Sequence, residues 1–132
     1  MVFVCVTDQG SMVLLQRRSL YSHDGGTWSC AGGALDELED PLEGALREAW
    51  EEIGPIPTHR VVGSFVFQPA TDWAYTTFVV QVDEQFDTMP NFESEEITWI
   101  AIDSVPQLSL HRGFSAAWPH LAALVQSVGI AG

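Results

Sequence analysis

The feature that most constrains the fold of this chain is a helix signal with a well-marked beginning and end. Asp40 suits the position just before a helix, Pro41 suits the first turn, and Glu43 completes a capping box. Gly54 then stops the pattern. The spacing predicts one amphipathic helix whose apolar face contains Leu42, Ala45, Leu46, Ala49, Trp50 and Ile53.

Short apolar and β-branched runs on both sides of this helix predict strands. The runs are Val2–Val6, Met12–Leu15, Trp28–Cys30, Val61–Gln68, Tyr75–Val82 and Ile97–Ile102. A turn signal at residues 8–11 joins the first two runs as a hairpin, and the acidic stretch from Asp83 to Glu96 is predicted to be a loop.

A second helical pattern lies near the C-terminal end of the sequence. Apolar residues recur at helical spacing from Phe114 to Val128, and Gly129 is the expected stop. Pro119 falls inside this pattern, where a helix tolerates proline only in its first turn. Trp118 here and Trp50 on the first helix both fall on apolar faces, so we expect both in the core.

Length and composition favour one folded domain over residues 1–132. The hydrophobic fraction of 46% is too high for a disordered chain. No apolar run approaches the roughly 20 residues that a membrane helix needs, and Met1 leads into a strand pattern without the basic region of a secretory signal. We therefore expect a cytoplasmic protein with no membrane partner.

The charge balance excludes several kinds of partner. Eighteen Asp and Glu residues face five Arg and no Lys, which gives a formal net charge of −13. This argues against binding nucleic acid or an anionic membrane through a basic surface, so a polyanionic ligand would need metal ions as adapters. Cys5 and Cys30 lie far apart without zinc-site spacing and are expected to be small buried residues, although the sequence leaves a disulfide open.

Three acids of the first helix form a cluster apart from its apolar face. Glu48, Glu51 and Glu52 share one arc of the helix at spacings of three and four residues. Like charges at these spacings cost a few tenths of a kcal/mol per pair, and an oxygen-preferring cation such as Mg²⁺ would remove the repulsion. The alternative is a solvated acidic face.

The spacing of the residues around this cluster favours a cation site over a solvated acidic face. Gly33, Glu39, Arg47-Glu48, Glu51-Glu52 and Gly54 resemble the Nudix box, G-x5-E-x7-R-E-U-x-E-E-x-G-U, in which U is a bulky apolar residue. Every fixed charged and glycine position is matched. The departures, at Ala31, Leu38, Ala49 and Pro55, remove no implied metal ligand and bear on loop shape and substrate fit.

This resemblance to the MutT-like Nudix family implies a fold and a reaction. The implied fold is an α/β/α sandwich around a mixed β-sheet. The implied reaction is Mg²⁺- or Mn²⁺-dependent hydrolysis of the pyrophosphate bond in a small nucleoside diphosphate derivative, by water attack at phosphorus. The substrate stays open, as does a homodimer. Two other hypotheses are a Nudix-like domain that binds a nucleotide without turnover and an acidic cation-binding domain.

The resemblance also assigns roles within the box. It implies that Glu48 and Glu52 are the first metal ligands, with Glu51 close behind and the carbonyl of Gly32 as a further ligand. It implies that Arg47 pairs with Glu39 and orients the helix; the alternative is a free surface charge. Glu51 is also a candidate catalytic base.

Outside the box, the candidates follow from position. The family often takes a further catalytic carboxylate from a later loop, and Glu93, Glu95 and Glu96 all precede the strand that contains Trp99. We favour Glu96 for this role; the alternative is that all three face solvent. Arg17 or Arg18 is expected to contact phosphate, while Trp28 and Tyr75 are candidates for stacking on a base, with packing in the fold as their alternative.

Overall fold

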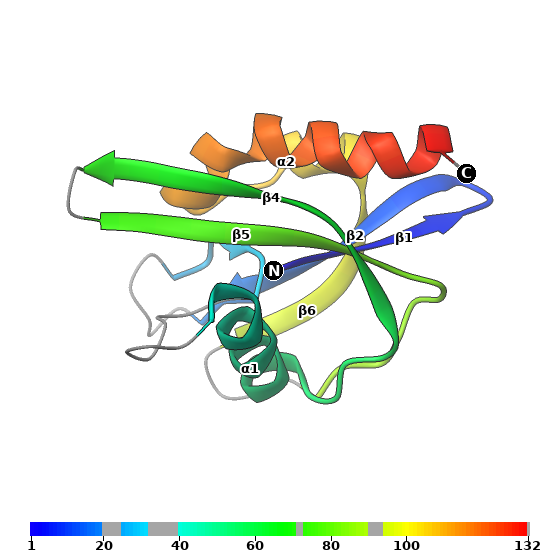
Figure 1. The fold of residues 1–132 in the computed structure, drawn as a ribbon, viewed down its shortest axis with the longest axis horizontal. Coiled ribbons are helices and arrows are strands. Elements are labelled where there is room, and N and C mark those ends of the chain that lie inside the picture. The colour runs from blue at the N-terminus through cyan, green and yellow to red at the C-terminus, as the bar shows by residue number, and fades with distance from the viewer. Residues whose placement is uncertain (20–24, 32–39, 71–72, 90–93, 132) are drawn as a thin grey trace.

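A mixed β-sheet forms the centre of the fold (Figure 1). The computed structural model describes residues 1–19, 25–31, 40–70, 73–89 and 94–131. The strands in this part of the chain are β1 (Val2–Thr7), β2 (Gly10–Arg18), β3 (Trp28–Ser29), β4 (His59–Ala70), β5 (Trp73–Val82) and β6 (Ser94–Ala101). The helices are α1 (Pro41–Ile53), the short 3₁₀ helix η1 (Ile102–Gln107) and α2 (Arg112–Ala131).

The strand order explains why the sheet is mixed. Along the main path the order is β3-β2-β1-β5-β4, and β6 pairs with β2. β1 and β2 form the predicted antiparallel hairpin, with Thr7 opposite Gly10, whereas β1 and β5 run parallel. The pairs β2–β6 and β4–β5 are antiparallel. Each predicted strand is present, and β6 begins at Ser94, inside the stretch that was predicted to be a loop.

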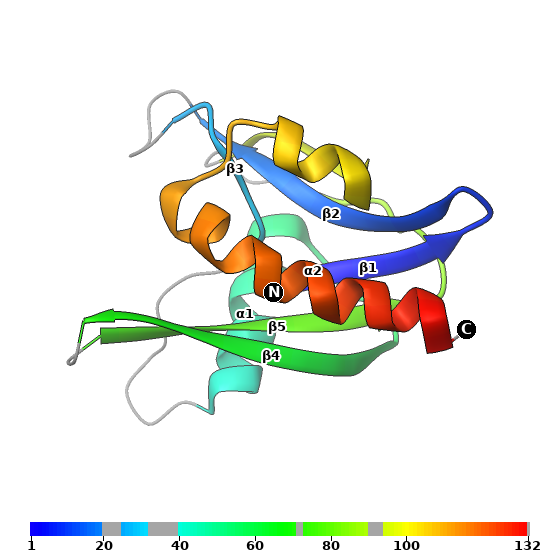
Figure 2. The same cartoon turned by 90° about the horizontal axis from the view of Figure 1, so that it is seen from above.

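Two helices cover opposite faces of this sheet, which confirms the predicted three-layer sandwich (Figures 1 and 2). β1 shows the reason, because successive side chains of a strand point to opposite faces. Val2 and Val4 pack in the core under α2, while Phe3 and Cys5 pack in the core under α1. The sheet is therefore buried on both sides, as its continuous apolar runs require.

The local signals at both ends of α1 are confirmed. The Asp40 carboxylate accepts hydrogen bonds from the backbone N–H groups of Leu42 and Glu43, at 3.1 and 3.2 Å. At the other end Gly54 adopts φ +94°, a conformation that favours glycine, and its N–H donates to the carbonyl of Trp50. These contacts fix where the helix starts and stops, and so which of its side chains face the sheet.

The prediction for Trp50 is wrong. Trp50 as a residue is 56% exposed, whereas Ala49 and Ile53 are fully buried against the sheet. Trp50 lies about 100° around the helix from Ala49, at the margin of an apolar stripe that the sheet covers only in the middle. Trp118 on α2 is buried as predicted.

α2 is longer than predicted. It runs from Arg112 to Ala131, so Gly129 does not stop it and Pro119 lies beyond its first turn. Proline removes one helical hydrogen bond, in this case to the carbonyl of Ser115. Because Ser115 and Pro119 are both on the exposed side of α2, water can satisfy that carbonyl. A glycine inside a helix costs about 1 kcal/mol relative to alanine, which tertiary packing can offset.

Both cysteines are free thiols, so the structure contains no disulfide between them. Cys5 is buried as predicted, and Cys30 is half-buried. Burial raises the pKa of the Cys5 thiol, and the nearby negative charges of Glu84 and Asp83 raise it further. Within the described residues, no helix combines the length and the apolar character that crossing a bilayer demands.

Candidate functional site

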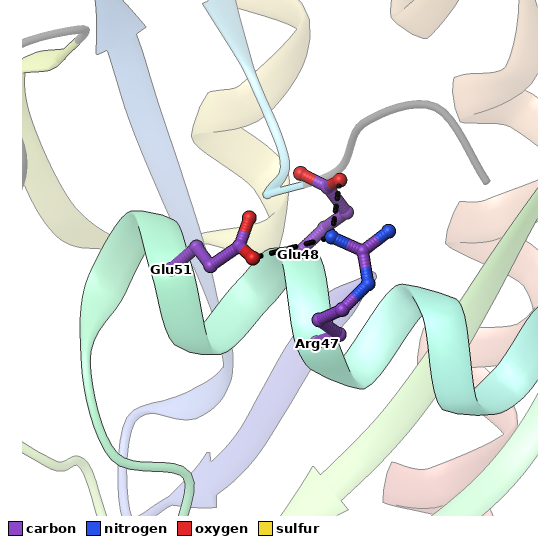
Figure 3. A network of polar contacts seen from close by, with 3 residues as sticks. All are labelled: Arg47, Glu48 and Glu51. Atoms are coloured by element: carbon purple, nitrogen blue, oxygen red, sulfur yellow. Dashed lines mark hydrogen bonds and ion pairs between the residues drawn. The ribbon is translucent and has the colours of Figure 1, made fainter. Parts of the chain in front are cut away.

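Arg47 joins two glutamates of α1 (Figure 3). Its Nη1 lies 2.9 Å from Oε1 of Glu48 and 3.2 Å from Oε1 of Glu51. The side chain of Glu48 is 18% exposed and that of Glu51 is 55% exposed, so the three groups run from the sheet side of the helix to its surface. Arg47 is therefore not a free surface charge, and it offsets the repulsion between the two carboxylates.

Glu52 is held on the buried side of the same helix. Its residue exposure is 9%, and Nε2 of Gln16 on β2 donates a hydrogen bond of 3.2 Å to its Oε2. Gln16 itself is only 6% exposed. An ionised carboxylate buried in this way needs compensation from charge or hydrogen bonds, so the site is built from both the helix and the sheet.

Sequence reasoning missed Gln16. A signal was present, because Gln16 directly follows the buried run Val13-Leu14-Leu15 and shares a strand face with Leu14. Since Leu14 packs in the core under α1, the same parity places the Gln16 side chain toward α1. A polar residue at a core position needs a polar partner, and that partner is Glu52.

The donor set of this site fits a hard divalent cation. Carboxylate oxygens are the protein ligands that Mg²⁺ and Mn²⁺ prefer, and Glu48 and Glu52 lie one turn apart on the side of α1 that faces the sheet. In addition, Oε1 of Gln16 is buried and finds no hydrogen-bond donor among the described residues. The described part of the chain holds no converged group of three or more His, Cys, Asp or Glu side chains. Gly32 and Glu39 lie outside the described residues.

A second polar group lies on the other face of the sheet. Arg17 on β2 is directly opposite Trp28 on β3 and Glu96 on β6. The guanidinium carbon of Arg17 is 5.9 Å from the centre of the Trp28 ring, and its Nη2 is 3.7 Å from Oε1 of Glu96. Trp28 packs against the core under α2, so this group faces α2.

Strand parity separates Glu96 from the glutamates of α1. Ile97 is directly opposite Gln16 and packs in the core under α1. Glu96, as the neighbouring residue on β6, therefore points to the α2 face. The structure does not bring Glu96 together with Glu52. Glu93 and the side chain of Glu95 lie outside the described residues.

The remaining predicted contacts are described only in part. Arg18 ends β2, where its backbone N–H donates to the carbonyl of Thr27 and its carbonyl accepts from the N–H of Gly26. These bonds join the end of β2 to the two residues directly before β3. Tyr75 lies on β5 opposite Phe67, but its side chain is outside the described residues.

Comparison with known proteins agrees with the motif and the fold. The family model for the NUDIX domain matches residues 1–123. This chain belongs to the Nudix family. The Nudix box thus corresponds to α1 and the segment before it, and Glu48, Glu51 and Glu52 lie in the part of the box that the structure describes.

Several relatives of this Nudix chain have names. A Mycobacterium tuberculosis protein provisionally named 8-oxo-dGTP diphosphatase 3 is 42% identical over 90% of this chain and 58% of its own length. A nucleoside triphosphate pyrophosphatase/Nudix hydrolase fusion protein of Bifidobacterium longum is 37% identical over 96% of this chain and 27% of its own length. The chain thus spans little more than half of the first relative and about a quarter of the second.

Solved structures give the same fold. The crystal structure of RenU, a Nudix hydrolase from M. smegmatis, superposes with a TM-score of 0.80 and 35% identity, over 96% of this chain and 83% of that one. The NUDIX domain of Shewanella oneidensis NrtR, solved with ADP-ribose, has a TM-score of 0.68 at 20% identity, over 96% and 82% of the two chains. The second likeness concerns the fold alone.

Proposed function

We propose that this Nudix chain is a Mg²⁺- or Mn²⁺-dependent hydrolase that cleaves the pyrophosphate bond of a small nucleoside diphosphate derivative. The observation that carries the proposal is the placement of Glu52, a buried carboxylate of the Nudix helix held by Gln16 beside Glu48. A purely solvated acidic face would leave this carboxylate in water. Because substrate and protein are both anionic, bound cations would neutralise phosphate oxygens and lower the pKa of a bound water.

The residues of α1 have different roles in hydrolysis. Glu48 and Glu52 bind the cation, and Arg47 orients the carboxylates of Glu48 and Glu51 through the contacts that Figure 3 shows. A water oxygen bonds to one phosphorus, and the bond from that phosphorus to the bridging oxygen breaks. The bridging oxygen leaves with the other phosphate, and Glu51 accepts the proton of the water. Gly32 and Glu39 complete the site as a metal ligand and a partner of Arg47.

The α2 face supplies the contact with the nucleoside. Trp28 offers a ring for stacking, and Arg17 beside it offers a cation for an anionic group of the substrate other than the phosphate that the cation at α1 would hold. Glu96 orients Arg17 through their ion pair, rather than acting as the catalytic base. Arg18 and Tyr75 are further candidates for substrate contact. The named M. tuberculosis relative supports nucleoside triphosphates, oxidised ones included, as the first substrates to test.

The two free thiols support a reducing compartment, and we place the reaction in the cytoplasm.

A substrate panel tests this function. The purified chain is incubated with 8-oxo-dGTP, the ordinary nucleoside triphosphates, ADP-ribose, a sugar nucleotide and a dinucleoside polyphosphate, with Mg²⁺, with Mn²⁺ and with a chelator. We expect metal-dependent release of a nucleoside monophosphate from at least one compound. Binding of a nucleotide without turnover would support a regulatory domain instead, and metal binding without nucleotide binding would support a cation-binding domain.

Two variants separate the roles of the carboxylates. Glu51→Gln should lower kcat by about two to four orders of magnitude, the usual cost of losing a general base. Glu96→Gln should leave kcat near the wild-type value and raise KM, because it loosens Arg17 and leaves α1 intact. A large fall in kcat for Glu96→Gln together with an active Glu51→Gln would instead assign the role of general base to Glu96 on β6.

A further inference from the structure

Gln16 contacts the Nudix helix but does not belong to the Nudix box. It lies on β2, thirty-six positions before Glu52, and its amide reaches the Nudix helix at 3.2 Å. We propose that Gln16 is a positioning residue, which fixes the Glu52 carboxylate in the orientation in which it binds the cation. This inference rests on the proposed metal-dependent function.

The chemistry of the pair fixes which way the amide points. An ionised carboxylate only accepts hydrogen bonds, so the NH₂ end of Gln16 must face Glu52. The bond is therefore made between Nε2 of Gln16 and Oε2 of Glu52. It also turns the carbonyl oxygen of Gln16 away, where this buried atom meets no donor among the described residues. A core position that served packing alone would not keep an unpaired acceptor, because an apolar side chain avoids that cost.

The surroundings of Gln16 make the contact rigid. The hollow beside it is lined, among the described residues, by Phe3, Leu14, Leu15, Ala31, Ile53 and Ile97, so its amide is the polar side chain of an apolar lining. Strands flank Gln16 on both edges, with Ser29 opposite on β3 and Ile97 opposite on β6. A hydrogen bond in such an apolar place is stronger than one in water, and strands on both sides keep the amide from moving away.

A fixed carboxylate should bind a cation more tightly than a mobile one. Part of the cost of binding is the ordering of the ligand side chain, and the Gln16 bond orders Glu52 before the cation arrives. Partners of metal ligands typically change metal affinity by about ten- to a hundredfold when they are removed. The role of Gln16 is thus measurable as metal affinity, without any substrate or turnover.

The test is Mn²⁺ binding to the metal-free chain, with free Mn²⁺ followed by its electron paramagnetic resonance signal. Gln16→Met keeps the length of the side chain and removes the amide, and we expect its Kd for Mn²⁺ to rise about tenfold or more. Gln81→Met, a half-buried glutamine on β5 away from the site, is the matched control and should bind like the wild type. Gln16→Asn, which keeps an amide too short to reach Glu52, should bind as weakly as Gln16→Met.

A double variant tests whether Gln16 changes the Mn²⁺ affinity through Glu52. If Gln16 acts through Glu52, then adding Gln16→Met to Glu52→Gln should weaken Mn²⁺ binding little further, so that the two effects are not additive. Wild-type affinity in both Gln16 variants, or full additivity with Glu52→Gln, would overturn the positioning role alone. Failure of the wild type to bind Mn²⁺ would overturn the metal site, and with it both this inference and the proposed function. Near-ultraviolet circular dichroism of the metal-free variants reports whether each one is folded.

Discussion

The addition of Mg²⁺ or Mn²⁺ should raise the melting temperature of the metal-free chain strongly. Arg47 pairs with both Glu48 and Glu51, and Glu52 is buried on the same helix of a protein whose formal net charge is −13. A divalent cation bound there neutralises charge that the fold has concentrated. The unfolded chain does not hold these glutamates together, because they come to lie on one helix at fixed spacing only when α1 forms, so the cation stabilises the native state selectively.

The size of the effect follows from linkage. A ligand that binds the native state alone stabilises it by about 2.7 kcal/mol at a hundredfold excess over Kd. Unfolding entropy of about 2.1 cal/mol/K per residue amounts to roughly 0.28 kcal/mol/K for 132 residues. The melting temperature should therefore rise by about 10 °C. A variant with tenfold weaker binding, such as Glu52→Gln, should show a rise of about 5 °C at the same metal concentration.

Differential scanning calorimetry of the chelator-treated chain, titrated with MnCl₂, measures this rise. NaCl at equal ionic strength is the control, since screening alone relieves some repulsion among surface charges. A rise that saturates with Mn²⁺, is absent with NaCl and shrinks in Glu52→Gln supports the site on α1. Equal melting temperatures in MnCl₂ and NaCl would refute the reasoning, because a native-state ligand site must stabilise the fold.

Other expected outcomes concern the fold. Asp40→Ala removes the cap of α1 and should lower the free energy of unfolding by about 1 kcal/mol in urea titrations. Leu121→Ala, at a fully buried position of α2, should lower it by about 2–5 kcal/mol in the same assay. Arg60→Ala breaks only an exposed ion pair and should change it by less than about 1 kcal/mol. Iodoacetamide at neutral pH should alkylate Cys30 before Cys5 by mass spectrometry, because burial raises the pKa of the Cys5 thiol and so lowers its thiolate fraction.

The parts of the fold that rest on local chemistry were predictable from the sequence. The capping carboxylate of Asp40 and the left-handed Gly54 fix α1 through contacts within a few residues, and both appear as the sequence indicates. The hairpin of β1 and β2 likewise follows from a short turn between two β-rich runs. In each case the energy that decides the structure comes from neighbours along the chain.

The errors arise where distant packing decides. Trp50 satisfies the helical period of α1, yet only contact with the sheet determines how wide an apolar stripe is covered, and Trp50 falls outside it. Gly129 and Pro119 weaken a helix locally, but α2 continues through both because its buried face is anchored by residues such as Leu121. A stop signal is thus a local cost that tertiary contacts can outweigh.

The same distinction between local and distant contacts separates the site residues that the sequence predicts from those that it does not. The motif predicts Glu48, Glu51 and Glu52 as a group on one helix, and they do lie together on α1, because the geometry of a single helix is known in advance. The motif was not sufficient to find Gln16, because the contact with Glu52 depends on how α1 crosses β2. Nor could it place Arg47 between Glu48 and Glu51, since helical spacing allows several partners for an arginine.

Glu96 shows what strand parity adds to a residue chosen from its position along the chain. Trp99 and Ile97 pack in the core under α1, so the alternation of β6 directs Glu96 toward α2 before any contact is considered. The register of β6 on β2 then sets it opposite Arg17, at 3.7 Å, and not opposite Gln16. The carboxylate is therefore fit to orient a substrate-binding arginine and unfit to share a cation with Glu52. This parity predicts that Glu96→Gln raises KM and leaves kcat near the wild-type value. If Glu96→Gln instead lowers kcat and leaves KM unchanged, β6 must leave its register on β2 when substrate binds.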